Sequence, residues 1–266
     1  MTGSAQVLTQ EQLHQYQEDG YLFLPDFLNT GDLSDIYEDL ERLTRDGGES
    51  TVFESSSEAV RALHGSQLVS AACDRLCRSA SLLAAARAVV GSDVYLYQFK
   101  INMKAPFVGE VWPWHQDYIF WRNEDGMPAP DVVSIVVFLD EVTEFNGPMY
   151  LIPRSHAKGL IEPIAPSVAE RSTEGGWIDD VSADLKYQIP HSVVRTLAED
   201  GGIAAPKGPP GSVFFFHSNL VHGSAPNISP FPRRIAILTY NSTANVPSQS
   251  TQVRPAFLVN PISTPL

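Results

Sequence analysis

Between residues 94 and 242 the sequence consists of short apolar or alternating segments separated by Gly, Pro and Asn. The segments read VYLYQFKINMK, WPWHQDYIFW, VVSIVVFLDEV, PMYLIPRSH, GSVFFFHSNLVHGS and RRIAILTYNS. Each has about the length of a β-strand and stops at residue types that favour turns. At least six strands at this spacing predict a mainly β protein, built as a sandwich or barrel.

Residues 1–93 show a mostly helical pattern instead. Thr9, with Gln12 three residues later, predicts the start of a helix that ends near Gly20, and the following YLFLPDFL is expected to be extended. The segments LSDIYEDLERLTRD and LVSAACDRLCRSASLLAAARAVV each predict one helix. Cys73 and Cys77, four residues apart in the latter, are expected to be small core residues.

Length and charge limit the classes of partner. With 266 residues, 43% of them hydrophobic, the chain can form one domain, 1–266, around a sizeable core. The net charge of −13 argues against nucleic acid or an anionic membrane and favours a small-molecule ligand, bound by a monomer or homodimer. The opening MTGSAQVLTQEQLHQ shows no basic stretch followed by an apolar run. We therefore predict neither a signal peptide nor a membrane span, and expect a cytoplasmic location.

A long connection, residues 157–210, interrupts the strands of the predicted core, which spans residues 94–245. The connection is polar and contains a predicted short helix, HSVVRTLAED, followed by Gly201 and Gly202. It is long enough to form a lid over a site rather than a simple turn.

His115 and Asp117 stand two residues apart inside the apolar run WPWHQDYIFW, where an ionised carboxylate requires a partner. On a strand, residues i and i+2 point to the same face, so the two side chains would form adjacent corners of a metal site. The third corner would come from a distant strand. Its candidates are His156, His191, His217 and His222, with His14 and His64 less favoured because they lie in the helical region.

The segment around His222 decides between these candidates. His222 is predicted to end an apolar strand, and Arg233 follows eleven residues later on the next strand. Two histidines and one carboxylate form the facial triad of non-haem Fe(II) oxygenases, whereas zinc sites usually contain more His or Cys. An acidic cosubstrate that chelates iron needs a cation at its far end, which a guanidinium provides. His217, inside the predicted strand, is better explained by packing or by a hydrogen bond behind the ligands.

The motifs WHQDYIFWRNEDGMP and EFNGPMYLIPRSH resemble those of the phytanoyl-CoA dioxygenase (PhyH) family of Fe(II)/2-oxoglutarate-dependent hydroxylases, including its ectoine hydroxylases. The segments QFKINMK, VTEFNGP, HGSAPNISPF and TYN are still more similar to the leucine 5-hydroxylase of griselimycin biosynthesis within that family. The resemblance covers nearly the whole chain. It implies a double-stranded β-helix, the cupin-like jelly roll, with supporting N-terminal helices.

The same resemblance implies roles for individual residues, with Fe(II), 2-oxoglutarate and O2 as cofactors. The iron ligands would be His115, Asp117 and His222. Arg233 would bind the distal carboxylate of 2-oxoglutarate. The residues expected to assist in cosubstrate binding are Ser134, Ser224, Gln98 and Lys100, although Ser134 is also compatible with simple burial on a strand.

Two neighbouring residues are expected at the substrate. Trp121, six residues after His115, matches an aromatic wall of the substrate pocket, with ordinary barrel packing as the alternative. Arg122 beside it is the candidate for binding a substrate carboxylate. The alternative for Arg122 is a salt bridge with Glu124 or Asp125.

The activity implied by the resemblance is hydroxylation of an unactivated carbon of a free, leucine-like aliphatic L-amino acid, with succinate and CO2 as coproducts, in specialised metabolism such as antibiotic biosynthesis. Asp117 favours hydroxylation because related halogenases lack this carboxylate. Alternative substrates are ectoine, proline, a carrier-bound amino acid or an acyl-CoA, the last disfavoured by the net charge. Gln116 and Tyr118 depart from the ectoine hydroxylase pattern and argue against ectoine. A non-catalytic binding module would predict a broken triad.

Overall fold

The computed structural model describes residues 7–164, 177–181, 184–248 and 254–266. Its strands are β1 (Tyr21–Leu24), β2 (Thr51–Phe53), β3 (Val60–His64), β4 (Val94–Lys104), β5 (Trp112–His115), β6 (Val132–Phe138), β7 (Met149–Leu151), β8 (Val213–His217), β9 (His222–Ser224) and β10 (Arg233–Ser242). Its α-helices are α1 (Gln10–Asp19), α2 (Ser34–Asp46), α3 (Ala71–Cys77), α4 (Ala80–Val90), α5 (Tyr118–Asp125) and α6 (His191–Gly201). Short 3-10 helices are η1 (Thr30–Leu33), η2 (Ser66–Leu68), η3 (Ser155–Lys158) and η4 (Trp177–Asp180).

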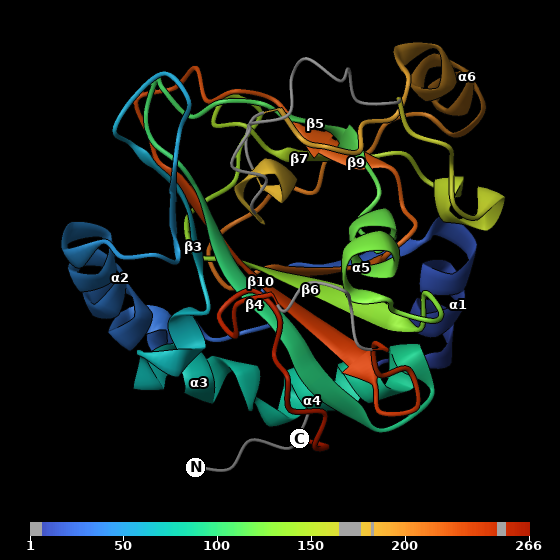
Figure 1. The fold of residues 1–266 in the computed structure, drawn as a ribbon, viewed down its shortest axis with the longest axis horizontal. Coiled ribbons are helices and arrows are strands. Elements are labelled where there is room, and N and C mark those ends of the chain that lie inside the picture. The colour runs from blue at the N-terminus through green and yellow to red at the C-terminus, as the bar shows by residue number, and fades with distance from the viewer. Residues whose placement is uncertain (1–6, 165–176, 182–183, 249–253) are drawn as a thin grey trace.

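The strands form two antiparallel sheets. The larger sheet has the order β1-β8-β6-β10-β4-β3-β2, and the smaller has the order β5-β9-β7. Figure 1 shows the smaller sheet on one side of the larger one and the helices α2, α3 and α4 on the other side. The mainly β prediction and the double-stranded β-helix are confirmed, with the metal-site strands β5 and β9 adjacent in the smaller sheet.

Alternation along the strands of the larger sheet creates two apolar layers. On β10, Ile235 and Ile237 face the space between the sheets, where they pack with Phe214 and Phe216 of β8. Leu238 belongs to the layer on the opposite face, under the N-terminal helices. Burial of each such side chain contributes about 1.5–3 kcal/mol, so the two layers fix the sheet from both faces. The face toward the smaller sheet is the one that borders the site.

The N-terminal part follows the predicted helices in part. Thr9 and Gln12 form a complete capping box at α1, and Gly20 ends that helix in a left-handed conformation. The single helix expected around residues 68–90 is wrong, because Ser79 adopts extended backbone angles and separates α3 from α4. Strands β2 and β3 also lie in this part and were not predicted. Cys73 and Cys77 are buried in the core as expected, and burial raises the pKa of the Cys73 thiol to about 11.

Two strand boundaries near the predicted metal site differ from the expectation. The strand of WPWHQDYIFW ends at His115, and α5 begins at Tyr118, so His115 and Asp117 do not lie on one strand face. Asp117 has helical backbone angles, φ −69° and ψ −38°. His222 does not end an apolar strand either: β8 ends at His217, and His222 begins β9 in the other sheet. An all-apolar run cannot distinguish strand from helix by its period, which explains the first error.

The predicted lid, residues 157–210, lies partly outside the described residues, since these omit 165–176 and 182–183. Within the described part, η4 and α6 belong to this connection, and α6 ends at Gly201 with Gly202 as its C-cap, as expected. Among the helices of the described ranges, none has the length and apolarity needed to cross a membrane.

Candidate iron and 2-oxoglutarate site

The structure brings His115, Asp117 and His222 together at one point between the sheets. His115 and His222 are direct partners in the β5–β9 register, and Asp117 begins the helix that follows β5. The Nε2 atoms of His115 and His222 lie 3.6 Å and 3.9 Å from Oδ1 of Asp117. Within the described chain, these three form the group of His, Cys, Asp and Glu side chains whose donor atoms, all within 4.8 Å of one another, could hold a metal ion.

Hydrogen bonds and burial favour the tautomers and protonation states in which these side chains can bind a divalent metal. The Nδ1 atoms of His115 and His222 donate to the carbonyls of Pro113 and Leu220, at 2.7 Å and 2.9 Å, which leaves both Nε2 lone pairs facing Asp117. Burial lowers the pKa of His222 to about 3, so the ring is neutral at neutral pH. Burial alone would raise the pKa of Asp117, but Lys100 and the two histidines hold it well below its usual range.

The other candidate histidines lie elsewhere. The rings of His156 and His217 pack 5.2 Å apart, and His217 Nδ1 accepts a hydrogen bond from the backbone of Asn219. His14 and His191 are exposed on α1 and α6, and His64 borders a cavity beside the triad. The structure therefore agrees with the choice of His222 over His217.

A first cavity adjoins the triad and extends along β10 to Arg233. The space between its walls, including the part open to solvent, is about 380 Å³. Four buried polar atoms on its lining residues have no hydrogen-bond partner: Asn102 Oδ1, Trp112 Nε1, Ser224 Oγ and Arg233 Nη1. An unsatisfied buried polar group costs about 1–3 kcal/mol, so this surface is suited to a polar ligand. Three of the four are donors, which fits a small dicarboxylate such as 2-oxoglutarate.

Arg233 is fixed at the far end of this cavity. It is buried, and its Nε donates to the carbonyl of Gly147 at 3.1 Å. Burial lowers the pKa of Arg233 to about 9, so the side chain is still a cation at neutral pH. A charged guanidinium with an unpaired Nη1 beside Ser224 can hold a carboxylate.

Of the other residues predicted to assist in binding the cosubstrate, only some border the first cavity. Lys100 borders both the first cavity and a second one, whereas Gln98 borders only the second. Ser134 lies opposite Thr239 in the β6–β10 register and bonds its hydroxyl at 3.2 Å. That register position is six residues along β10 from Arg233, so the structure does not bring Ser134 to the guanidinium.

The second cavity, of about 420 Å³, lies on the α5 side of the triad. Phe120 and Trp121 of α5 line it, and Trp121 Nε1 donates to Gln98 Oε1 at 3.2 Å. Arg122 is exposed and does not line either of these cavities, because the next residue on a helix points about 100° away. Arg254 does line the second cavity, and its Nη2 atom lies 3.0 Å from Oδ2 of Asp180.

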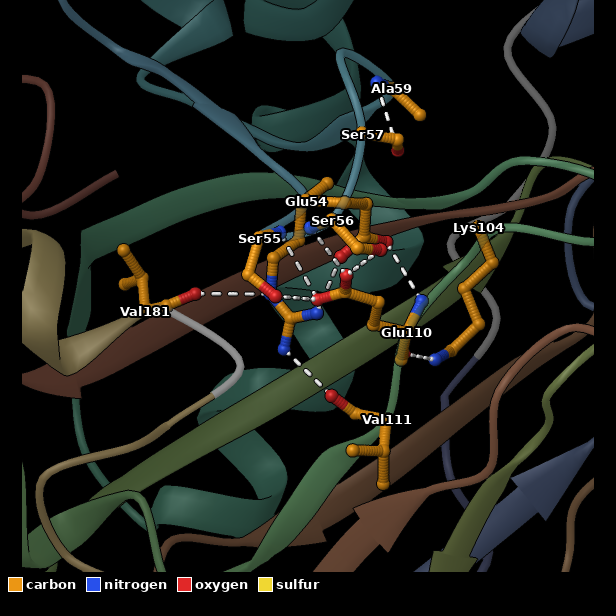
Figure 2. A network of polar contacts seen from close by, with 10 residues as sticks. Glu54, Ser55, Ser56, Ser57, Ala59, Lys104, Glu110, Val111 and Val181 are labelled. Carbon is orange, nitrogen blue, oxygen red and sulfur yellow. Dashed lines mark hydrogen bonds and ion pairs between the residues drawn. The ribbon is translucent and has the colours of Figure 1, made fainter.

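A buried ion pair supports the wall between the two cavities. Trp112 lines both, and the guanidinium of Arg61 lies 3.8 Å from the centre of its ring. Arg61 also bonds Glu54 Oε2 at 2.8 Å and the carbonyl of Val181, in the segment over the second cavity, at 3.2 Å. Figure 2 shows Glu54 and Val181 on different sides of this network. Arg61 thus connects the shared wall at Trp112 to Val181, which also lines the second cavity.

Glu110 accepts most of the remaining hydrogen bonds of the network in Figure 2. Its carboxylate accepts hydrogen bonds from the backbone and hydroxyl groups of Ser55 and Ser56, and its carbonyl accepts one from Lys104. Lys104 is the direct β4 partner of Arg233. Burial and the charge of Arg233 lower the pKa of Lys104 to about 6. An anion bound at this end of the first cavity would offset the repulsion between the two bases.

A buried facial triad beside an arginine-ended cavity, inside a double-stranded β-helix, defines a non-haem iron, 2-oxoglutarate-dependent dioxygenase. The phytanoyl-CoA dioxygenase (PhyH) family model matches residues 16–235, and the chain belongs to this family. The predicted family, enzyme class, Fe(II), 2-oxoglutarate and O2 are confirmed, and the substrate is a small molecule.

Several relatives resemble the chain over most of its length. L-proline trans-4-hydroxylase of Streptomyces griseoviridis is 42% identical, over 95% of this chain and 92% of the relative. Ectoine dioxygenase of Bordetella bronchiseptica is 36% identical, over 94% and 82%. The crystal structure of EctD from S. alaskensis with 2-oxoglutarate and 5-hydroxyectoine has a TM-score of 0.80 at 29% identity, covering 99% of this chain and 88% of that one. The same protein with bound Fe has a TM-score of 0.79.

Proposed function

We propose that this protein hydroxylates an unactivated carbon of a free aliphatic L-amino acid, with L-leucine and L-proline as leading candidates, and releases succinate and CO2. The observation that carries the proposal is the second cavity, where aromatic and aliphatic walls adjoin an ion pair, Arg254 with Asp180, beside the triad. The similarity to an L-proline hydroxylase supports a free amino acid, and the sequence motifs support leucine. A role in antibiotic or other specialised metabolism, by a monomer or homodimer, is part of the proposal.

The residues divide the work between the two cavities. His115, Asp117 and His222 would hold Fe(II), which when bound supplies the activation of O2 coupled to decarboxylation of 2-oxoglutarate. Arg233, with Ser224, holds the remote carboxylate of 2-oxoglutarate and fixes its orientation. The buried apolar wall, in particular Phe216 packed 4.8 Å from the ring of His222, keeps water away from the reacting centre.

Arg254 is the residue proposed to hold the substrate carboxylate, in place of Arg122. The carbon closest to the metal is the one oxidised, so anchoring the substrate at Arg254 sets which carbon of the aliphatic chain reaches the triad. Trp121 and Phe120 contact that chain. This arrangement needs one free carboxylate on the substrate, which a carrier-bound amino acid lacks.

The departures from the ectoine pattern carry less weight than the sequence suggests. Gln116 is buried away from both cavities, where its side chain bonds the backbone of Gly159, Asn219 and Ile161. The hydroxyl of Tyr118 bonds the carbonyl of Met127. Neither residue contacts the substrate cavity, so ectoine belongs in the substrate panel.

The test is turnover with a substrate panel. The purified protein, supplied with Fe(II) and 2-oxoglutarate, is incubated with L-leucine, L-proline, other aliphatic L-amino acids and ectoine. We expect succinate release together with a mass gain of one oxygen for an aliphatic amino acid. If only ectoine, or no free amino acid, gains oxygen, the proposal is refuted.

Matched variants connect the activity to the triad. Asp117→Ala is expected to abolish hydroxylation and Fe(II) binding. Glu199→Ala, which removes an exposed carboxylate from α6, is the control and should leave both intact. Full hydroxylation by Asp117→Ala would contradict the ligand assignment.

A further inference from the structure

Asp180 is a carboxylate placed inside the second cavity. It ends η4, and both Asp180 and the next residue, Val181, line the second cavity. Its Oδ2 atom lies 3.0 Å from Nη2 of Arg254, and only about a tenth of either side chain is exposed. In the proposed function Arg254 binds the substrate carboxylate, whereas no substrate group is assigned to Asp180.

The neighbouring carboxylates are held in other ways. Asp125 lies 3.3 Å from Nη1 of Arg254 and accepts a hydrogen bond from the hydroxyl of Tyr97, outside the lining of the cavity. Glu124 is bonded at 2.6 Å by Lys186 and also at 2.6 Å by Tyr187. Arg254 therefore keeps Asp125 as a partner if its contact with Asp180 is exchanged for a ligand.

The negative charge of Asp180 is only partly compensated in the cavity, so an additional cation beside it would be stabilising. Burial raises the pKa of Asp180 to about 6, even though Arg254 acts in the opposite direction. The guanidinium alone thus does not fully offset the cost of burying this carboxylate. A second positive group beside it would lower that cost.

We propose that Asp180 binds the α-ammonium group of the substrate, while Arg254 binds the α-carboxylate. This inference rests on the proposed function, since it names the group that selects amino acids. The two charged groups of an α-amino acid are attached to the same carbon, so the zwitterion can insert at the Arg254–Asp180 pair and give each side chain a new partner. A carboxylic acid without the amino group would place its charge near Asp180 with no compensation and is rejected.

The experiment compares each accepted amino acid with its deaminated analogue, which is 4-methylpentanoate for leucine and cyclopentanecarboxylate for proline. Binding to the protein loaded with Fe(II) and 2-oxoglutarate is measured by calorimetry, and kcat and KM by succinate release. The wild-type protein is expected to bind the amino acid on the order of 100-fold more tightly than the analogue. Equal binding of the two by the wild type overturns the inference, whatever the variants do.

Asp180→Asn keeps the shape and removes the charge. We expect it to raise KM for the amino acid on the order of 10- to 100-fold, to leave KM for 2-oxoglutarate unchanged, and to reduce discrimination against the analogue. Asp184→Asn, an exposed carboxylate four residues later, is the control and should behave as wild type. Unchanged discrimination in Asp180→Asn overturns the inference while leaving the proposed function intact. If the wild type binds no amino acid, both fail.

Discussion

Replacement of Arg61 by alanine is expected to destabilise the protein strongly. The change leaves Glu54 buried without the guanidinium that lies 2.8 Å away, and breaking a buried pair from one side costs about 3–5 kcal/mol. Loss of the stacking on Trp112 adds about 0.5–2 kcal/mol. The expected decrease in the free energy of unfolding is therefore about 3.5–7 kcal/mol, a large part of the 5–15 kcal/mol typical of a folded domain.

Urea denaturation, with the slope m checked for constancy, measures this loss. Arg75→Ala is the matched control, because the side chains of Arg75 and Asp35 are 61% and 64% exposed and such a pair is worth at most about 1 kcal/mol. The double variant Arg61→Met with Glu54→Leu should recover part of the stability, since it removes both buried charges. If Arg61→Ala costs no more than Arg75→Ala, the structural importance given to the ion pair is wrong.

Three other changes test the first cavity and its surroundings. Arg233→Met should weaken binding of 2-oxoglutarate at least about 30-fold in calorimetry, because a desolvated charge partner is lost, and an unchanged affinity would remove Arg233 from the site. For Glu110, burial alone would raise the pKa, but hydrogen bonds from two serines lower it to about 2 against an ordinary 4.5. Its stabilisation is present above pH 4.5 and lost as the pH falls through 2, so thermal unfolding should show Glu110→Gln less stable than wild type at pH 7, with the difference shrinking as the pH falls from 4.5 to 2. Gly147→Ala should cost roughly 1–3 kcal/mol in the same assay, because its φ is +78° and the new Cβ would lie 2.7 Å from the carbonyl oxygen of Ala225. Gly91→Ala, with φ +77° but no atom within 4 Å, is the control and should cost less.

The parts of the fold that the sequence predicts well are those with a local signal. The middle of strand β10, residues 235–238, alternates between the two apolar layers, and the cap at Thr9 depends on residues three apart. The first turn of α5, residues 118–121, consists of four consecutive buried apolar residues, so neither the helical nor the strand period is visible in it. Strands β2 and β3 are short, and they are held as strands by pairing, β3 with the distant β4 and β2 with β3.

The site residues also fall into those that a local sequence signal predicts and those that only the structure reveals. The triad and Arg233 come from two short segments, so their spacing is informative within the sequence. The misplacement of Ser134 arises from the strand register, which no local pattern reveals. Asp180, at the end of the short helix η4, and Arg254 are single charged residues separated by 74 positions, and only the tertiary structure brings them together.

Cations concentrated inside an acidic molecule also affect how the cosubstrate arrives. The surface of a chain with net charge −13 repels a dianion at long range, whereas Arg233 and Lys100 attract it only once it has entered. Because the Debye length is about 8 Å at physiological ionic strength, added salt screens the repulsion during approach far more than the attraction at the buried arginine. The association rate of 2-oxoglutarate should therefore rise with salt while its dissociation rate stays nearly constant, the reverse of the usual behaviour of an anion that binds to an arginine.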